Sequence, residues 1–128
     1  MSLRIVQLGT SRHAREGVRI GTVRRPPRGV PKARFAADNW YDTWLPELSP
    51  SAELVKLALH ASNEREWARF VTHFRAEMKA APAAHALDLL AALSHTTNLS
   101  IGCYCEDESR CHRSVLRALL TERGADIA

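Results

Sequence analysis

The chain has 128 residues, of which 45% are hydrophobic and 25% are charged, and its formal net charge is +4. This composition is ordinary for a soluble globular protein, and the length suffices for one domain whose core needs neither disulfides nor metal. No apolar run approaches the roughly 18 residues of a membrane span, so a membrane-spanning helix is excluded. We therefore expect a single domain over residues 1–128.

The first residues and the cysteines indicate where the protein works. The apolar part of the first ten residues is too short for a secretory signal peptide and has no cleavage region. All three cysteines lie within nine positions, Cys103 to Cys111, which is not an even disulfide framework. We expect a cytoplasmic protein whose cysteines are reduced, metal-bound or catalytic.

Positive charge gathers in the first quarter of the chain. Nine of the 18 Lys and Arg residues lie in the first 34 positions, where the one acidic residue is Glu16. Clustered positive potential attracts anions, so one interpretation is a phosphate-bearing partner, either an anionic small molecule or a nucleic acid. The other interpretation is that these arginines pair with acidic residues elsewhere in the same fold.

Two short segments at the start are typical of strands. Leu3 to Leu8 and Val18 to Val23 are rich in aliphatic residues and are bounded by glycine. The stretch from residue 24 to 32 contains three prolines, which fix φ and remove backbone donors, so it is predicted to be irregular and exposed. It carries four cations: Arg24, Arg25, Arg28 and Lys32.

An aromatic segment precedes the first predicted helix. Trp40 and Trp44 could stack bases or cover a ligand, but two indoles more often bury their large area against a core. Ser49 is suited to cap a helix with Pro50 at its first position, and the helix is predicted to run to about His60.

The remaining elements follow from helical and strand patterns. Asn63 is a possible cap for a helix whose core stripe comprises Trp67, Phe70, Val71, Phe74 and Met78. An apolar helix is predicted from Ala83 to about His95, then a strand from Leu99 to Tyr104, then a helix from Ser109 to Arg123 that ends at Gly124. This order predicts an α/β fold: a small, mainly parallel sheet covered by about four helices.

The strongest functional signal is the junction between the last strand and the last helix. Ligands of open α/β sheets bind beyond the carboxyl ends of strands, and a helix N-terminus favours anions. Cys103 and Cys105 point to one face if the segment is extended, and Ser109 as N-cap would place Cys111 and His112 in the first helical turn.

Four interpretations of this junction remain open. Cys103, Cys105, Cys111 and His112 are the four ligands that a tetrahedral zinc site needs, although their spacing is unusual. Cys111 could be a nucleophile with His112 as its base. The helix N-terminus and Arg113, with the arginines of the proline-rich loop, could bind an anion. Alternatively, the cysteines are small buried hydrophobes.

Several segments together resemble a known family, the YeaO-like proteins of domain of unknown function 488. The matching segments are Arg24 with Pro27-Arg28-Gly29-Val30 and Lys32, then Trp44 to Ser51 with Glu53-Leu54, then Trp67, Phe70, Glu77 and Met78. Cys111-His112-Arg113 resembles the form found in other branches, and Val23 stands where the YeaO branch usually carries an acidic residue. The resemblance implies a small cytoplasmic bacterial α/β domain without a settled activity.

These observations together predict one candidate site. The anion-binding residues are Arg24, Arg28, Lys32 and Arg113, and Cys111 and His112 are the catalytic pair if the protein is an enzyme. The resemblance implies that Trp44 and Ser49 lie in the same pocket. The sequence assigns no cofactor with certainty, and zinc is the metal that the cysteines could hold.

Overall fold

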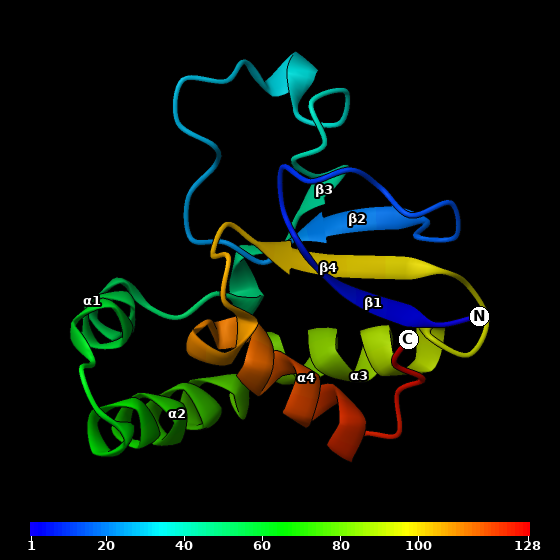
Figure 1. The fold of residues 1–128 in the computed structure, drawn as a ribbon. Helices are drawn as coiled ribbons and strands as arrows, with labels where there is room; N and C mark the ends of the chain where they lie inside the picture. Colours follow the sequence, from blue (N-terminus) through cyan, green and yellow to red (C-terminus); the bar gives the residue numbers. More distant parts are fainter.

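Four short strands form one fully parallel sheet in the computed structural model, which describes residues 1–128. Their spatial order is β1 (Leu3–Gln7), β4 (Leu99–Cys103), β2 (Val18–Gly21) and β3 (Thr43–Trp44). β4 pairs with both β1 and β2, and all five of its residues are buried (Figure 1). The small parallel sheet of the sequence prediction is confirmed. β3 was not predicted, because two residues are too few to show a strand pattern.

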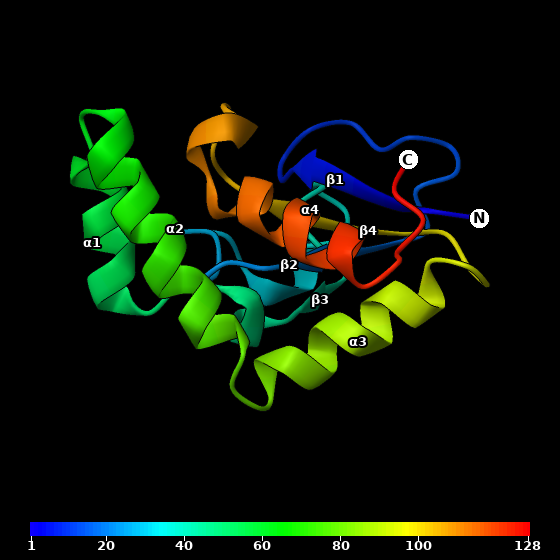
Figure 2. The same cartoon turned by 90° about the horizontal axis from the view of Figure 1, so that it is seen from below.

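Four helices cover one face of this sheet. They are α1 (Ala52–His60), α2 (Glu64–Met78), α3 (Ala83–Leu93) and α4 (His112–Glu122). Figure 2 views the molecule from the helical side, with α3 and α4 lying across the sheet. α1 and α2 form a pair at the end of the sheet to which the strands run (Figure 1). α1 contributes no fully buried residue, so it is attached mainly through its contacts with α2.

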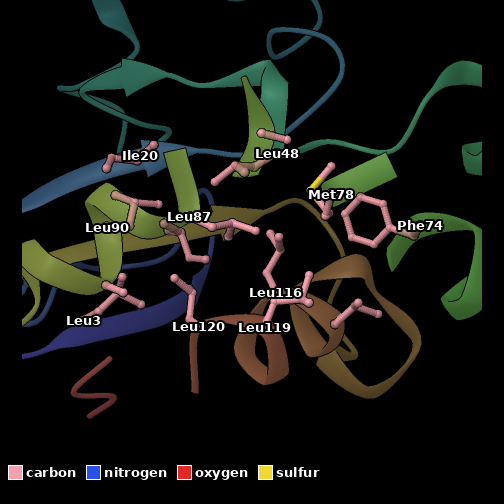
Figure 3. Close-up of a cluster of buried hydrophobic side chains, with 14 of the residues drawn as sticks. Leu3, Ile20, Leu48, Phe74, Met78, Leu87, Leu90, Leu116, Leu119 and Leu120 are labelled. Carbon is pink, nitrogen blue, oxygen red and sulfur yellow. The ribbon is translucent and has the colours of Figure 1, made fainter. Parts of the chain in front are cut away.

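The hydrophobic core lies between the sheet and α2, α3 and α4 (Figure 3). Phe70, Phe74 and Met78 of α2 are buried, as the helical stripe predicted, and the rings of Phe70 and Phe74 are stacked with centroids 5.7 Å apart. Each fully buried side chain of this size contributes roughly 1.5–3 kcal/mol. The core therefore fixes the position of α2 and α4 relative to the strand ends.

The opposite face of the sheet carries a buried ion pair beside a smaller apolar cluster that includes Leu8 and Tyr41. Arg19 of β2 is fully buried, and its Nη2 donates to the Glu16 carboxylate at 2.9 Å. Burial by itself would raise the pKa of Glu16, but hydrogen bonds from Arg19, the Ser100 hydroxyl and the His13 N–H outweigh it and hold that pKa below its usual range. Such a pair is stable only when each hydrogen-bonding position is used.

Arg19 also joins two loops that cross this face. Its Nη1 donates to the carbonyl of Thr10 at 3.0 Å and to the carbonyl of Asn39 at 2.7 Å. These loops connect β1 to β2 and β2 to β3, and neither contains an α-helix. The buried guanidinium therefore replaces a helical connection as the support for both loops.

Helix α1 begins later than the sequence predicted. Ser51 is its N-cap, and the Ser51 hydroxyl accepts from the N–H of Leu54 at 3.4 Å. The prediction that Ser49 caps this helix was wrong, because Ser49 ends a short 3₁₀ turn at Pro46–Leu48 and its hydroxyl donates to the Pro50 carbonyl. The Asn63 cap of α2 is confirmed, since its side chain accepts from the N–H of Glu66 at 2.9 Å.

None of the four helices combines the length and the apolar character needed to cross a membrane.

Candidate functional site

A pocket of about 960 Å³ opens at the carboxyl ends of the three longer strands. Segments from all of these strand ends line it, together with one side of α1 and the start of α4. Parallel sheets bind ligands at this edge because their loops and helix N-termini converge there. The polar and aromatic residues around it are Gln7, Thr10, Arg24, Arg25, Arg28, Trp40, Ser49, Lys56, Phe70, Cys103, Tyr104, Cys105, Arg110, Cys111 and His112.

The three cysteines and one histidine meet at this pocket. Cys103 is the last residue of β4, and its Sγ lies 3.9 Å from the Sγ of Cys105, as expected for side chains on one face of an extended segment. The ligand atoms of Cys103, Cys111 and His112 all lie within 4.8 Å of one another, and all three residues are buried. Cys105 is exposed. The cluster could therefore hold a metal ion.

The last helix begins at His112 rather than near Ser109. Cys111 is extended, with φ −125° and ψ 152°, and occupies the N-cap position of α4. Ser109 is not the cap, because both its N–H and its hydroxyl donate to the Asp107 carboxylate, which caps a separate 3₁₀ turn at Glu108–Arg110. Cys111 consequently sits at the positive end of the helix dipole, which favours a thiolate.

His112 is held in a defined orientation beside Cys111. Its Nε2 lies 2.7 Å from the carbonyl oxygen of Thr22, and its Nδ1 lies 3.8 Å from the Sγ of Cys111. A carbonyl oxygen only accepts, so Nε2 carries the hydrogen and the Nδ1 side faces the thiol. The ring also packs edge-on against Phe74 of α2, with centroids 5.8 Å apart. Helix, strand end and core together fix the imidazole.

The thiols differ in acidity. Hydrogen bonds from the thiols of Cys103 and Cys105, together with the neighbouring His112, lower the pKa of Cys111 below its usual value despite burial. The pKa of Cys103 is raised, because its thiol donates to Cys105 and Cys111 and is buried. One sulfur of the three, that of Cys111, is therefore the preferred thiolate.

Three arginines of the proline-rich loop form a cationic rim. Arg24, Arg25 and Arg28 line the pocket, are exposed and form no ion pair. Lys32 is exposed as well, but it lies in a 3₁₀ turn and does not line the pocket. The segment carries the free positive charge that the sequence indicated.

Other cations of the basic first quarter pair within the fold. Arg12 bonds Asp42 at 2.9 Å, Arg34 bonds Asp38 at 2.8 Å, and Arg19 is buried against Glu16. The interpretation that the basic residues pair with acidic residues of the same fold is confirmed for these three arginines. Among the remaining cations of this quarter, Arg24, Arg25 and Arg28 line the pocket, whereas Arg4, Arg15 and Lys32 do not.

Arg113 lies away from the rim. It is 3% exposed, its Nη2 donates to the carbonyl of Cys105, and it does not line the pocket. The guanidinium braces the turn that carries Cys105, and its Nε has no partner. The structure therefore brings Arg24 and Arg28 together with the cysteines and leaves Arg113 behind the turn.

Of the two pocket residues implied by the family resemblance, one lines the pocket and the other does not. Ser49 is buried and lines the pocket. Trp44 is 41% exposed outside the pocket, and its Nε1 donates to the carbonyl of Val23 at 2.7 Å, at the start of the arginine loop. The indole in the pocket is that of Trp40.

Sequence reasoning missed the groups that complete the site. Tyr104 lines the pocket beside Trp40, and its position directly after a buried strand was the available signal. The Thr22 carbonyl that orients His112 is a backbone group, so its role cannot be predicted from the residue type. It is placed by the sheet, since the N–H of Thr22 donates to Gly102 and continues the strand pairing by one residue.

A family model matches nearly the whole chain. The model described as "Active DUF488-N3 subclade" matches residues 3–124, a range that contains every strand, every helix and all three cysteines. No curated protein and no solved structure matches the chain.

Proposed function

The chain belongs to the DUF488 family, in its N3 subclade, and from this premise we propose that it is a thiol-dependent enzyme acting on a phosphate-bearing substrate. Cys111 is the nucleophile, His112 is its base, and the arginine rim binds the phosphate. The description of the subclade as active agrees with an enzymatic role. One observation carries the proposal: a buried thiol and an imidazole, oriented by a backbone carbonyl, face a pocket rimmed by unpaired arginines.

The geometry assigns a role to each member of the pair. The thiol proton passes to Nδ1 of His112, while Nε2 keeps its hydrogen on the Thr22 carbonyl. The sulfur then bonds to an electrophilic atom of the substrate, and the imidazolium returns the proton to the departing group. Water hydrolyses the resulting thio-intermediate and regenerates the thiol. Cys111 and His112 are adjacent in sequence, and they lie where the extended backbone of Cys111 gives way to the first residue of α4, with Sγ and Nδ1 3.8 Å apart.

The arginine rim supports a phosphate-bearing substrate. Arg24, Arg25 and Arg28 have no carboxylate partner, and guanidinium groups bind phosphate oxygens through paired N–H donors. The prolines in this segment limit the conformations that its arginines can adopt. A phosphate at the rim would place the rest of the substrate in the pocket toward Cys111.

Thiol labelling tests the catalytic pair. We expect iodoacetamide to modify Cys111 faster than Cys103 or Cys105 at pH 7, measured by peptide mass spectrometry. The His112→Gln variant keeps a donor for the Thr22 carbonyl but lacks the base, so it should slow Cys111 labelling by about tenfold or more. His73→Gln, an exposed histidine on α2, is the matched control. Equal labelling of all three cysteines in wild type and in His112→Gln would refute the proposal.

Protection by ligand tests the rim. Ribose 5-phosphate should slow the labelling of Cys111, and Arg28→Ala should raise the concentration needed by roughly fivefold, as expected for one charge-assisted hydrogen bond. Arg69→Ala, an exposed α2 arginine without an ion pair, should change nothing. Protection that is lost equally in both variants would mean nonspecific screening instead of a rim site.

A zinc site is the second candidate, because the ligand atoms of Cys103, Cys111 and His112 all lie within 4.8 Å of one another, although Cys105 is outside that set. Four ligands around one zinc lie about 3.5–3.8 Å from each other, given Zn–S and Zn–N distances of about 2.3 and 2.0 Å. The pair Cys103 and Cys105 is separated by 3.9 Å, and the pair Cys111 and His112 by 3.8 Å. A carbonyl on the second ring nitrogen, here that of Thr22, is also the usual partner of a metal-bound histidine.

Native mass spectrometry with a thiol count separates the two candidates. Protein purified without chelator should show the apo mass and three titratable thiols if Cys111 is a free nucleophile. A mass excess of one zinc, together with protection of all three cysteines, would replace the thiol enzyme by a zinc-binding module or a zinc-dependent enzyme.

A further inference from the structure

Two aromatic side chains form one wall of the pocket. Trp40 and Tyr104 both line it and meet edge to face, with ring centroids 5.8 Å apart at an angle of 76°. Both rings are half-buried and pack against a small apolar cluster that includes Cys103 and Cys111. The proposed chemistry uses neither ring, yet they border the thiols directly.

The Trp40 ring packs against the backbone of Gly9. A Cβ atom on Gly9 would lie 2.8 Å from the ring, so a glycine at this place lets the indole rest on the chain. The N–H of Gly9 donates to the carbonyl of Asn39, which also accepts from the buried Arg19. The indole is thereby fixed in the wall before any ligand binds.

The aromatic wall is tied to the cationic rim. The Tyr104 hydroxyl donates to the backbone carbonyl of Arg25 at 2.8 Å. This bond joins the end of β4 to the arginine loop, so the rings keep a set separation from the backbone that carries the arginines. A phosphate alone, or a sugar phosphate, would use the rim and leave the aromatic wall without a partner.

We propose that the substrate carries a nucleobase: the pocket binds a nucleotide, with its phosphate at Arg24, Arg25 and Arg28 and its base stacked on Trp40. The inference rests on the proposed function and names the substrate class of that site. Aromatic side chains beside arginines are the combination that binds bases and phosphates together. A pocket of about 960 Å³ has room for a nucleotide. A free nucleotide and the terminal nucleotide of a strand share this chemistry.

Calorimetric titration of the reduced protein tests the inference without any variant. The ligands are ribose 5-phosphate, the four common ribonucleoside monophosphates and a five-residue oligoadenylate. At least one monophosphate should bind about tenfold more tightly than ribose 5-phosphate, the gain expected from stacking one base. An oligoadenylate that binds more tightly still would assign the strand end as the source, and weaker binding would assign the free nucleotide.

Two variants locate the base. Trp40→Leu should reduce the affinity ratio of nucleotide to ribose 5-phosphate to about one, and Gly9→Ala should lower it by displacing the ring. Trp44→Leu, which changes an exposed indole outside the pocket, should keep the ratio. Equal affinity for ribose 5-phosphate and all four monophosphates would overturn the nucleotide inference and leave the proposed function intact. No binding of any of these ligands would overturn both.

Discussion

Removing the charge of Glu16 tests how much the buried ion pair with Arg19 stabilises the sheet face opposite the helices. Glu16→Gln keeps the shape of the side chain but leaves the guanidinium of Arg19, which is 0% exposed, without a negative partner. Breaking a buried pair in this way costs about 3–5 kcal/mol, because the remaining charge is uncompensated. A domain has about 5–15 kcal/mol in total, so the variant should fold with a greatly reduced margin.

Equilibrium urea unfolding at pH 7, followed by circular dichroism, measures this loss. The solvent-screened pair of Arg34 and Asp38 provides the control, since Asp38→Asn should cost far less stability than Glu16→Gln. The double variant Glu16→Gln, Arg19→Met should regain part of the lost stability, because it removes the isolated charge but also the donor to the Thr10 and Asn39 carbonyls. Equal losses in Glu16→Gln and Asp38→Asn would refute the reasoning.

The same pair predicts a pH dependence of stability. The pKa of Glu16 is lowered in the folded protein below its ordinary value of 4.5. The pair therefore contributes its full stability above the unfolded pKa, and this contribution is lost as the pH falls through the folded pKa. The wild-type protein should lose stability below about pH 4.5 more steeply than Glu16→Gln. Parallel curves for the two proteins would contradict the assigned shift.

Three further predictions concern packing, capping and metal. Gly102→Ala should destabilise by about 1–3 kcal/mol in urea unfolding, because its Cβ would lie 2.6 Å from Leu8 and 2.9 Å from the Val6 carbonyl. Ser51→Ala should cost about 1 kcal/mol in the same assay, through loss of the α1 cap on the N–H of Leu54. Dialysis against a chelator should leave the thermal midpoint unchanged if the cysteines are free thiols, and a fall of several degrees would favour zinc.

The regular elements of this fold could be predicted because their signals are local. The apolar stripe of α2, the glycine at position 124 with φ 79° and the apolar run of β4 each reflect a periodicity or a backbone requirement within a few residues. β3 has no such signal. Its two residues become a strand only because β2 offers Ile20 and Gly21 as partners.

The candidate site was predictable in place but not in detail. The cysteines mark the junction, and extended geometry puts Cys103 and Cys105 on one face as expected. The helix start was misplaced because Ser109 can serve as a cap, yet Asp107 takes its hydroxyl. Arg19 and Arg34 pair with acidic residues three and four positions away, but the partner of Arg12, Asp42, is distant in sequence and could not be foreseen. Tertiary contacts of this kind leave no pattern in a single chain.

The low burial of helix α1 affects how easily the lining of the pocket can change in sequence. Its Val55 and Leu59 line the pocket, yet no residue of α1 is fully buried and Leu59 is 74% exposed. Substitutions at exposed positions change stability by about half a kcal/mol or less. The residues of α1 that line the pocket can therefore be substituted, in evolution or in the design of a site for a new ligand. The core that positions Cys111 stays unchanged.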